Sequence, residues 1–114
     1  MAMHPNKTLL CSVDEIPENG SKSFQILQGY QEISIFITKR NKRLFTYKNH
    51  CPHTGAPLNW QPDTFMDRDG EYIQCSIHGA KFEVETGLCV WGPCATSHLI
   101  EIATTVENGN IYTQ

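Results

Sequence analysis

Two short segments of the chain each combine one thiol, one imidazole and a nearby glycine. The first is Cys51-Pro52-His53-Thr54-Gly55 and the second is Cys75-Ser76-Ile77-His78-Gly79. A loop of this length lets both side chains of a pair reach one metal centre, and glycine lets backbone amides approach that centre without a Cβ in the way. A single Cys–His pair occurs easily by chance. Two such pairs, both followed by glycine, predict a bound metal or metal cluster.

The four donors suit two kinds of metal centre. Two cysteines and two histidines satisfy a tetrahedral structural zinc site. Zinc ligands are commonly a Cys-Cys pair followed by a His-His pair, whereas here each segment supplies one of each. A mixed pair in each segment suits a two-iron centre, in which one iron takes both thiolates and the other takes both imidazoles. The donors alone favour iron and leave zinc open.

Both segments resemble the C-x-H and C-x-x-H boxes of Rieske proteins. The similarity continues in HTGAPL from residue 53 to 58 and in HGAKF from residue 78 to 82. Downstream, Thr86-Gly87 and Trp91-Gly92-Pro93 resemble the turn and the proline loop that cover the cluster in that family. The similarity is therefore specific, and it spans the middle of the chain from about residue 49 to residue 99.

This resemblance implies one Rieske-type [2Fe-2S] cluster as the cofactor. Cys51 and Cys75 would bind the inner iron, and His53 and His78 would bind the outer iron through Nδ1. A core of charge about +2 with two thiolates sums to about zero, so adding an electron costs less than at a site with four thiolates. The ligated imidazoles can also lose their outer protons, so the potential should depend on pH.

The resemblance also implies a low reduction potential within the family. High-potential members have an additional cysteine in each box, which form a disulfide, and a serine and a tyrosine that donate hydrogen bonds to sulfur. The corresponding residues here are Ala56, Ile77, Ala80 and Phe82. Because these side chains donate no hydrogen bond, we expect the lower part of the Rieske range of about −150 to +300 mV.

The rest of the sequence predicts β-structure that positions these loops. Between Glu32 and Lys39, isoleucines alternate with other residues, which indicates a strand with one buried face. Asn108-Gly109 predicts a tight hairpin turn. The expected strands are Thr8–Val13, Ser23–Leu27, Glu32–Lys39, Leu44–Lys48, Tyr72–Gln74, Lys81–Val84, Leu99–Val106 and Asn110–Thr113. We therefore expect an all-β fold, a Rieske-like antiparallel sandwich or barrel, as one domain over residues 1–114 with a loop-rich cluster-binding subdomain at about residues 49–94.

Composition excludes several classes of function. The chain has 114 residues, 39% hydrophobic and 18% charged, which is typical of a globular domain. A net charge of −3 gives no general attraction to nucleic acid or to anionic lipid. The first residues lack the apolar region of a secretory signal, and no stretch reaches membrane-spanning length. We expect a cytoplasmic protein that binds neither nucleic acid nor membranes.

Three cysteines fall outside the two boxes. Five cysteines is an odd number, so a complete set of disulfides is impossible, and metal binding or buried thiols explain them better. Cys11 and Cys94 are expected to be small packed side chains. A bond between Cys89 and Cys94 is conceivable but not expected in a reducing compartment. His50, beside a predicted ligand, is expected to be a loop residue and not a fifth ligand.

Three functions of different kinds are consistent with such a site. Because both irons would be fully ligated, the leading hypothesis is an electron carrier and not an enzyme. By resemblance to Rieske-type ferredoxins, it would take one electron from a flavin-dependent reductase and deliver it to a terminal oxygenase or reductase. The first alternative is a small Rieske-type subunit of a nitrite reductase-like complex. The second is a structural zinc module that binds other proteins.

Overall fold

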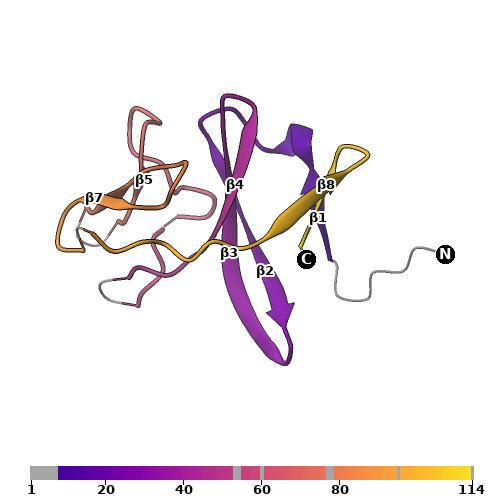
Figure 1. Ribbon diagram of the computed structural model, residues 1–114, viewed down its shortest axis with the longest axis horizontal. Coiled ribbons are helices and arrows are strands. Elements are labelled where there is room, and N and C mark those ends of the chain that lie inside the picture. The colour runs from indigo at the N-terminus through magenta and orange to yellow at the C-terminus, as the bar shows by residue number, and fades with distance from the viewer. Residues whose placement is uncertain (1–7, 53–54, 60, 77–78, 95, 114) are drawn as a thin grey trace.

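The computed structural model consists of three antiparallel sheets, each with three strands. It describes residues 8–52, 55–59, 61–76, 79–94 and 96–113. The three sheets follow one another along the longest axis of the molecule (Figure 1). Among the described residues the only helix is a short 3-10 turn, η1 (Val13–Glu15), and none is long and apolar enough to cross a membrane. The expected all-β fold is confirmed.

The strands are assigned to the sheets as follows. The first sheet has the order β1 (Leu9–Ser12), β9 (Asn110–Thr113), β8 (Thr104–Glu107). The second has the order β2 (Ser21–Gln28), β3 (Gln31–Arg40), β4 (Arg43–Lys48). The third has the order β5 (Ile73–Gln74), β6 (Lys81–Phe82), β7 (Cys89–Trp91). The first sheet therefore joins the two ends of the chain, whereas the other two are formed by consecutive strands.

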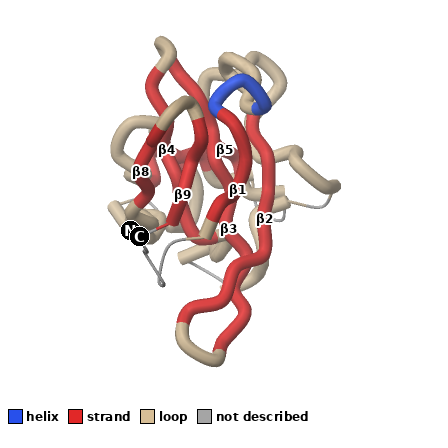
Figure 2. Tube along the Cα trace, turned by 90° about the vertical axis from the view of Figure 1, so that its right-hand side faces the viewer, coloured by secondary structure: helices blue, strands red, loops and turns tan. Residues whose placement is uncertain are grey.

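The central sheet consists of two hairpins that share β3. The β2–β3 hairpin extends beyond the rest of the molecule, as Figures 1 and 2 show from two directions. The β3–β4 hairpin turns at Asn41 and Lys42, which both have positive φ, 53° and 64°. Two consecutive positive φ values characterise the type I′ turn, whose twist matches that of the strands. These two polar residues therefore form the tight turn between β3 and β4.

β3 is buried on both faces, not on one as its alternation predicts. Ile35 and Ile37 pack toward the first sheet, in clusters that include Leu10 of β1 and Ile111 of β9. Phe36 points to the opposite face and is fully buried in a separate cluster with residues of the third sheet. Both faces of β3 are buried because β3 lies between two layers, so an apolar residue is favourable on either side.

The expected strand from Leu99 to Val106 begins later than predicted. Regular pairing starts only at Thr104, and the preceding segment runs along β4 with two backbone hydrogen bonds. Lys48 N–H donates to the Ile100 carbonyl at 2.8 Å, and Ile102 N–H donates to the Thr46 carbonyl at 2.9 Å. This extended segment links the third sheet back to the scaffold. β7 was not predicted, because glycine, proline and cysteine dominate its surroundings.

Candidate metal centre

Cys51 lies in a tight loop that follows β4. Its side chain is 1% exposed. The Cys51 N–H donates to the Ala56 carbonyl at 2.8 Å, and the Gly55 N–H donates back to the Cys51 carbonyl at 2.8 Å. Gly55 has φ +77°, a left-handed conformation that glycine adopts without strain. The two bonds close the loop around Cys51 and fix the direction of its side chain.

Cys75 lies in a loop with the same backbone frame, between β5 and β6. Its N–H donates to the Ala80 carbonyl at 2.8 Å, and the Gly79 N–H donates to the Cys75 carbonyl at 2.9 Å. Gly79 has φ +69°, and Cys75 is fully buried. The two cysteines therefore occupy equivalent positions in equivalent loops, five residues before a bonded alanine and four before a left-handed glycine.

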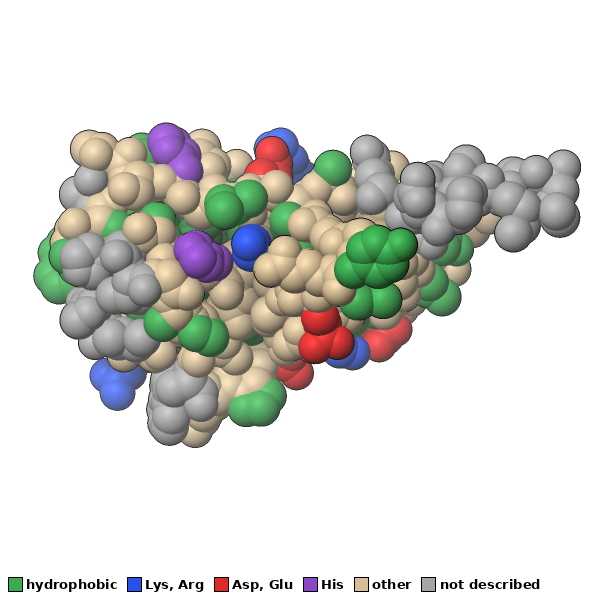
Figure 3. Space-filling model, turned by 90° about the horizontal axis from the view of Figure 1, so that it is seen from below, with side chains coloured by type: hydrophobic (Ala, Val, Ile, Leu, Met, Phe, Trp, Pro, Cys, Tyr) green, Lys and Arg blue, Asp and Glu red, His purple; other side chains and the backbone are tan. Residues whose placement is uncertain are grey.

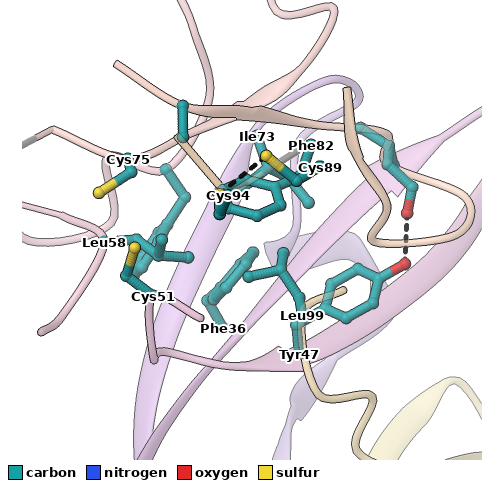
Figure 4. Close-up of a cluster of buried hydrophobic side chains, with 13 residues drawn as sticks. Phe36, Tyr47, Cys51, Leu58, Ile73, Cys75, Phe82, Cys89, Cys94 and Leu99 are labelled. Atoms are coloured by element: carbon teal, nitrogen blue, oxygen red, sulfur yellow. Dashed lines mark hydrogen bonds between the residues drawn. The ribbon is translucent and has the colours of Figure 1, made fainter. Parts of the chain in front are cut away.

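A backbone hydrogen bond joins the two loops. The Ser76 N–H donates to the Leu58 carbonyl at 2.8 Å. Figure 4 shows Leu58 between the two cysteines, with both sulfurs pointing toward the same region. The structure thus brings together the two predicted thiolate ligands from segments that are far apart in the sequence. The predicted ligands His53 and His78 lie outside the described residues.

Asn49 attaches the first loop to the scaffold, a role that the sequence alone did not reveal. Its side-chain oxygen accepts the Leu58 N–H at 2.7 Å. Its side-chain nitrogen donates to Asn59 at 2.8 Å and to the Ser34 hydroxyl of β3 at 3.2 Å. The only available signal was an asparagine just before the first box, a common feature of loops.

The proline loop, Trp91-Gly92-Pro93, packs on the second cysteine loop. Gly92 has φ +106°, and a Cβ at this position would lie 2.8 Å from the Cα of Ala80. Trp91 lies over Gly79 of the second cysteine loop, with a ring carbon 3.6 Å from where a Cβ of Gly79 would be. Only glycine at position 92 lets the two backbones approach this closely.

The described part of the site fits an iron–sulfur centre by its donors. Cys51 and Cys75 lie in one buried apolar cluster with Leu58 and Phe82. Apolar surroundings disfavour an ionised thiolate unless a cation balances it, and iron is such a cation. Within the ranges that the structure describes, no group of three or more His, Cys, Asp or Glu side chains could hold a metal ion. The described part therefore contributes two thiols, and further ligands must come from elsewhere.

Two more cysteines, Cys89 and Cys94, lie in the same cluster beside the site. Their exposed fractions are 2% and 4%, and their sulfurs are 2.8 Å apart. Burial, and then the hydrogen bond with Cys89, raise the pKa of the Cys94 thiol to about 12. Cys11 is buried in a different cluster, with Ile16, Ile37 and Ile111. Cys11 and Cys94 are thus packed inside, as expected.

A small all-β protein with paired cysteine loops is the class that this geometry defines. The sequence model of the Rieske [2Fe-2S] domain matches residues 6–107. The chain belongs to this family, whose domain carries one [2Fe-2S] cluster.

Known relatives agree with this assignment. The chain is 31% identical over 80 residues to the biphenyl dioxygenase ferredoxin subunit of Pseudomonas sp. (strain KKS102), covering 70% of this chain and 66% of the relative. It is 27% identical over 103 residues to the ferredoxin component of the p-cumate 2,3-dioxygenase system of Pseudomonas putida, and this match covers 90% of this chain and 80% of the relative. It spans only 24% of a longer relative, the cholesterol 7-desaturase of Caenorhabditis elegans.

Solved structures share the fold. The ferredoxin of carbazole 1,9a-dioxygenase from Nocardioides aromaticivorans IC177 matches with a TM-score of 0.72 at 18% identity, covering 94% of this chain and 95% of that one. A longer chain in a complex of the oxygenase and ferredoxin of carbazole 1,9a-dioxygenase matches with a TM-score of 0.76 at 16% identity, and this chain covers 27% of it. The antiparallel Rieske fold expected from the sequence is confirmed.

Proposed function

We propose that this protein is an electron carrier with one [2Fe-2S] cluster, bound by Cys51, His53, Cys75 and His78. It takes single electrons from a flavin-dependent reductase and passes them to a terminal oxygenase. The relatives that are ferredoxin components of dioxygenase systems support this function. They favour it over a nitrite reductase-type subunit and over a zinc module.

The observation that carries the proposal is the repeated loop frame. Each box places its cysteine at the same point of the same hydrogen-bonded loop, and the bond from Ser76 to Leu58 ties the loops together. Such a frame presents two thiolates from the inside of the protein. His53 and His78 follow their cysteines within the same loops, so they are the imidazoles that we assign to the outer iron.

When bound, the cluster supplies reversible one-electron chemistry. The residues of this chain exclude water and set the electrostatics of the site. Leu58, Phe82 and Leu99 belong to the apolar cluster around the two cysteines, and each is at most 5% exposed. Ala80 and Phe82 have no hydroxyl to donate to sulfur, and a missing donor lowers the reduction potential.

A partner can approach beside the second cysteine loop. An open cavity of about 660 Å³ lies there, lined by Tyr72, Gln74, Gly79, Lys81, Val90 and Trp91. Trp91 is 62% exposed. On the face of the molecule in Figure 3, the acidic side chains that are visible lie away from the loop-rich end. We assign the end with this cavity to contact with the oxygenase, because electron transfer requires the cluster to approach its acceptor closely.

Location and domain organisation belong to the same proposal. We place the protein in the cytoplasm, where reduced cysteines such as the buried Cys11 are the rule. We also propose that residues 1–114 form one domain in which the segment from about 49 to 94 is the cluster-binding subdomain. The third sheet, from Ile73 to Trp91, lies within that segment.

The decisive experiment is a metal and sulfide analysis of protein purified without oxygen from iron-replete cells. The proposal expects two irons and two acid-labile sulfides per chain, a red-brown colour and the spectrum of a mixed Cys–His cluster. A colourless protein with one zinc per chain would refute it in favour of the zinc module. A protein that always co-purifies in a fixed complex with a larger reductase would favour the subunit alternative.

A further inference from the structure

Cys89 and Cys94 form a pair of thiols that the proposed cluster does not use. They lie five positions apart, on β7 and just after the turn formed by Gly92 and Pro93. Their sulfurs are 2.8 Å apart, and both side chains are almost completely buried. Figure 4 shows the two side chains directed at each other.

The hydrogen bonds around the pair explain this arrangement. The Cys89 thiol donates to the carbonyl of Trp91 at 3.4 Å, so its sulfur is available to accept the thiol hydrogen of Cys94. Backbone bonds hold both ends of the turn: the Cys89 N–H donates to the Ser97 carbonyl at 2.8 Å, and the Ser97 N–H donates to the Cys94 carbonyl at 2.9 Å. The fold therefore places the sulfurs together before any bond forms between them.

We propose that Cys89 and Cys94 are a reversible dithiol–disulfide site that closes the turn over the second cysteine loop. A disulfide has an S–S distance of about 2.05 Å, so the sulfurs need to approach by only about 0.8 Å to reach it. Cytoplasmic disulfides are usually transient and often sense the redox state, which is the behaviour proposed for this pair. The inference does not depend on the cluster.

The oxidant belongs to the class of small disulfides, such as oxidised glutathione. Because both thiols are almost fully buried, the turn must open before the reaction. One protein thiol then loses its proton, attacks a sulfur of the small disulfide and releases one small thiol. The second protein thiol then attacks the resulting mixed disulfide, forms the Cys89–Cys94 bond and releases the second small thiol. The two electrons and two protons lost by the protein are gained by the two small thiols, and reduction follows the reverse path.

The bond would act on the loop that carries Cys75. The disulfide would close a ring of the residues from Cys89 to Cys94, and Gly92 lies within it. Gly92 packs against Ala80, whose carbonyl accepts the Cys75 N–H. A disulfide between the ends of the turn holds Gly92 in this position more firmly. Oxidation should therefore make the cover over the second loop more rigid without adding any ligand to the site.

The sequence allows a clear test by mass spectrometry. No Lys or Arg follows Lys81, so trypsin leaves residues 82–114 as one peptide that contains Cys89, Cys94 and no other cysteine. The purified protein, with its measured iron content, is equilibrated in glutathione buffers of rising oxidised fraction. Acid then stops thiol exchange, the protein is denatured, and the remaining free thiols are alkylated. Trypsin digestion follows. Cys11 is the internal control, because it falls alone in the peptide of residues 8–22.

In the wild type, peptide 82–114 should become lighter by two hydrogen atoms and lose both alkylation sites. The change should reverse with a reducing agent. Half-oxidation should need at least about tenfold less oxidised glutathione in the native protein than in urea, because the fold orients the thiols. In Cys94→Ser and Cys89→Ser, this form should not occur.

Two results would overturn the proposal. One is a native peptide 82–114 that stays fully alkylated, or carries only glutathione, at every buffer composition. The other is equal oxidation of native and urea-unfolded protein, which would mean that the fold does not prepare the pair. The absorption spectrum of the same samples reports the cluster separately, so a missing cluster and an unreactive thiol pair are distinguished.

Discussion

The two cysteine loops have the same backbone frame but different supports. Each has a cysteine whose N–H bonds an alanine carbonyl and a left-handed glycine that bonds back to the cysteine. The first loop is attached to β3 through the side chain of Asn49. The second loop lies between β5 and β6, each of two residues, and is covered by Gly92. One loop therefore depends on the large scaffold, and the other depends on contacts within the loop-rich region.

The difference in Cys–His spacing leaves this frame unchanged. His53 follows its cysteine by two positions, whereas His78 follows by three. Both spacings fit between the cysteine and the glycine that ends the loop. The frame depends on the cysteine, the glycine and the alanine of each loop, so it is the same at both spacings.

The largest expected effect is the loss of the cluster when a thiolate is removed from either loop. If the loops are equivalent, Cys51→Ser and Cys75→Ser should each reduce bound iron and sulfide to near zero. His53→Ala and His78→Ala should abolish the native visible spectrum. Metal analysis and absorption spectroscopy measure both results. Cys11→Ser, in a separate core, should retain the cluster; retention in Cys51→Ser or Cys75→Ser would show that the ligands are wrongly assigned.

The second effect tests how the second loop is covered. Gly92→Ala places a Cβ 2.8 Å from the Cα of Ala80 at a φ of +106°, so overpacking adds to backbone strain. We expect a loss of about 2–4 kcal/mol in the free energy of unfolding. Gly29→Ala is the matched control: its φ is +63° and nothing lies within 4 Å of the added Cβ, so only about 1–2 kcal/mol of strain applies.

Urea denaturation followed by circular dichroism measures both variants. Equal losses for Gly92→Ala and Gly29→Ala would show that contact with Ala80 contributes nothing, and that the proline loop does not stabilise the second cysteine loop.

The third effect tests the attachment of the first loop. Asn49→Ala removes the acceptor of the Leu58 N–H and the link to Ser34, so we expect a loss of about 1–3 kcal/mol. The amide hydrogen of Leu58 should exchange faster, because its partner is gone. Hydrogen exchange measured by NMR reports this change. Asn59→Ala keeps the hydrogen bond between Asn49 and Leu58, so it should lower the free energy of unfolding by less. A larger loss for Asn59→Ala than for Asn49→Ala would contradict the role given to Asn49.

The sequence predicted the strands well where a residue pattern reflects a single environment. Alternation identified β3 but assigned it one buried face, because a pattern within one strand does not reveal a second layer behind it. β7 was missed, since its pairing with β6 depends on the packing of Gly92 and Trp91 and not on strand preference. Long-range pairing of this kind is decided by tertiary contacts.

The candidate site, like the strands, could be predicted in part from the sequence. Residue types and spacing singled out Cys51 and Cys75, which the structure brings together (Figure 4). The assignment of Cys51, His53, Cys75 and His78 as cluster ligands stays a prediction. The common hydrogen-bond frame and the anchor at Asn49 could not be predicted, because each depends on backbone geometry that no local sequence signal encodes. A bond between Cys89 and Cys94 was conceivable from the sequence, but only the structure shows their sulfurs in contact.

The smallest expected effect concerns the reduction potential and the donors missing from the second loop. Ala80 and Phe82 are both almost fully buried beside Cys75 and have no hydroxyl. Protein voltammetry should therefore give a wild-type midpoint below zero at neutral pH. Ala80→Ser with Phe82→Tyr should raise it by about 80 mV, since each new hydrogen bond to sulfur contributes about 1 kcal/mol, or about 40 mV for one electron. Tyr112→Phe, in the terminal sheet, should leave the midpoint unchanged. A wild-type midpoint well above zero would mean that burial and missing donors do not set the potential, and the chemical difference from the high-potential members would then have to lie outside this loop.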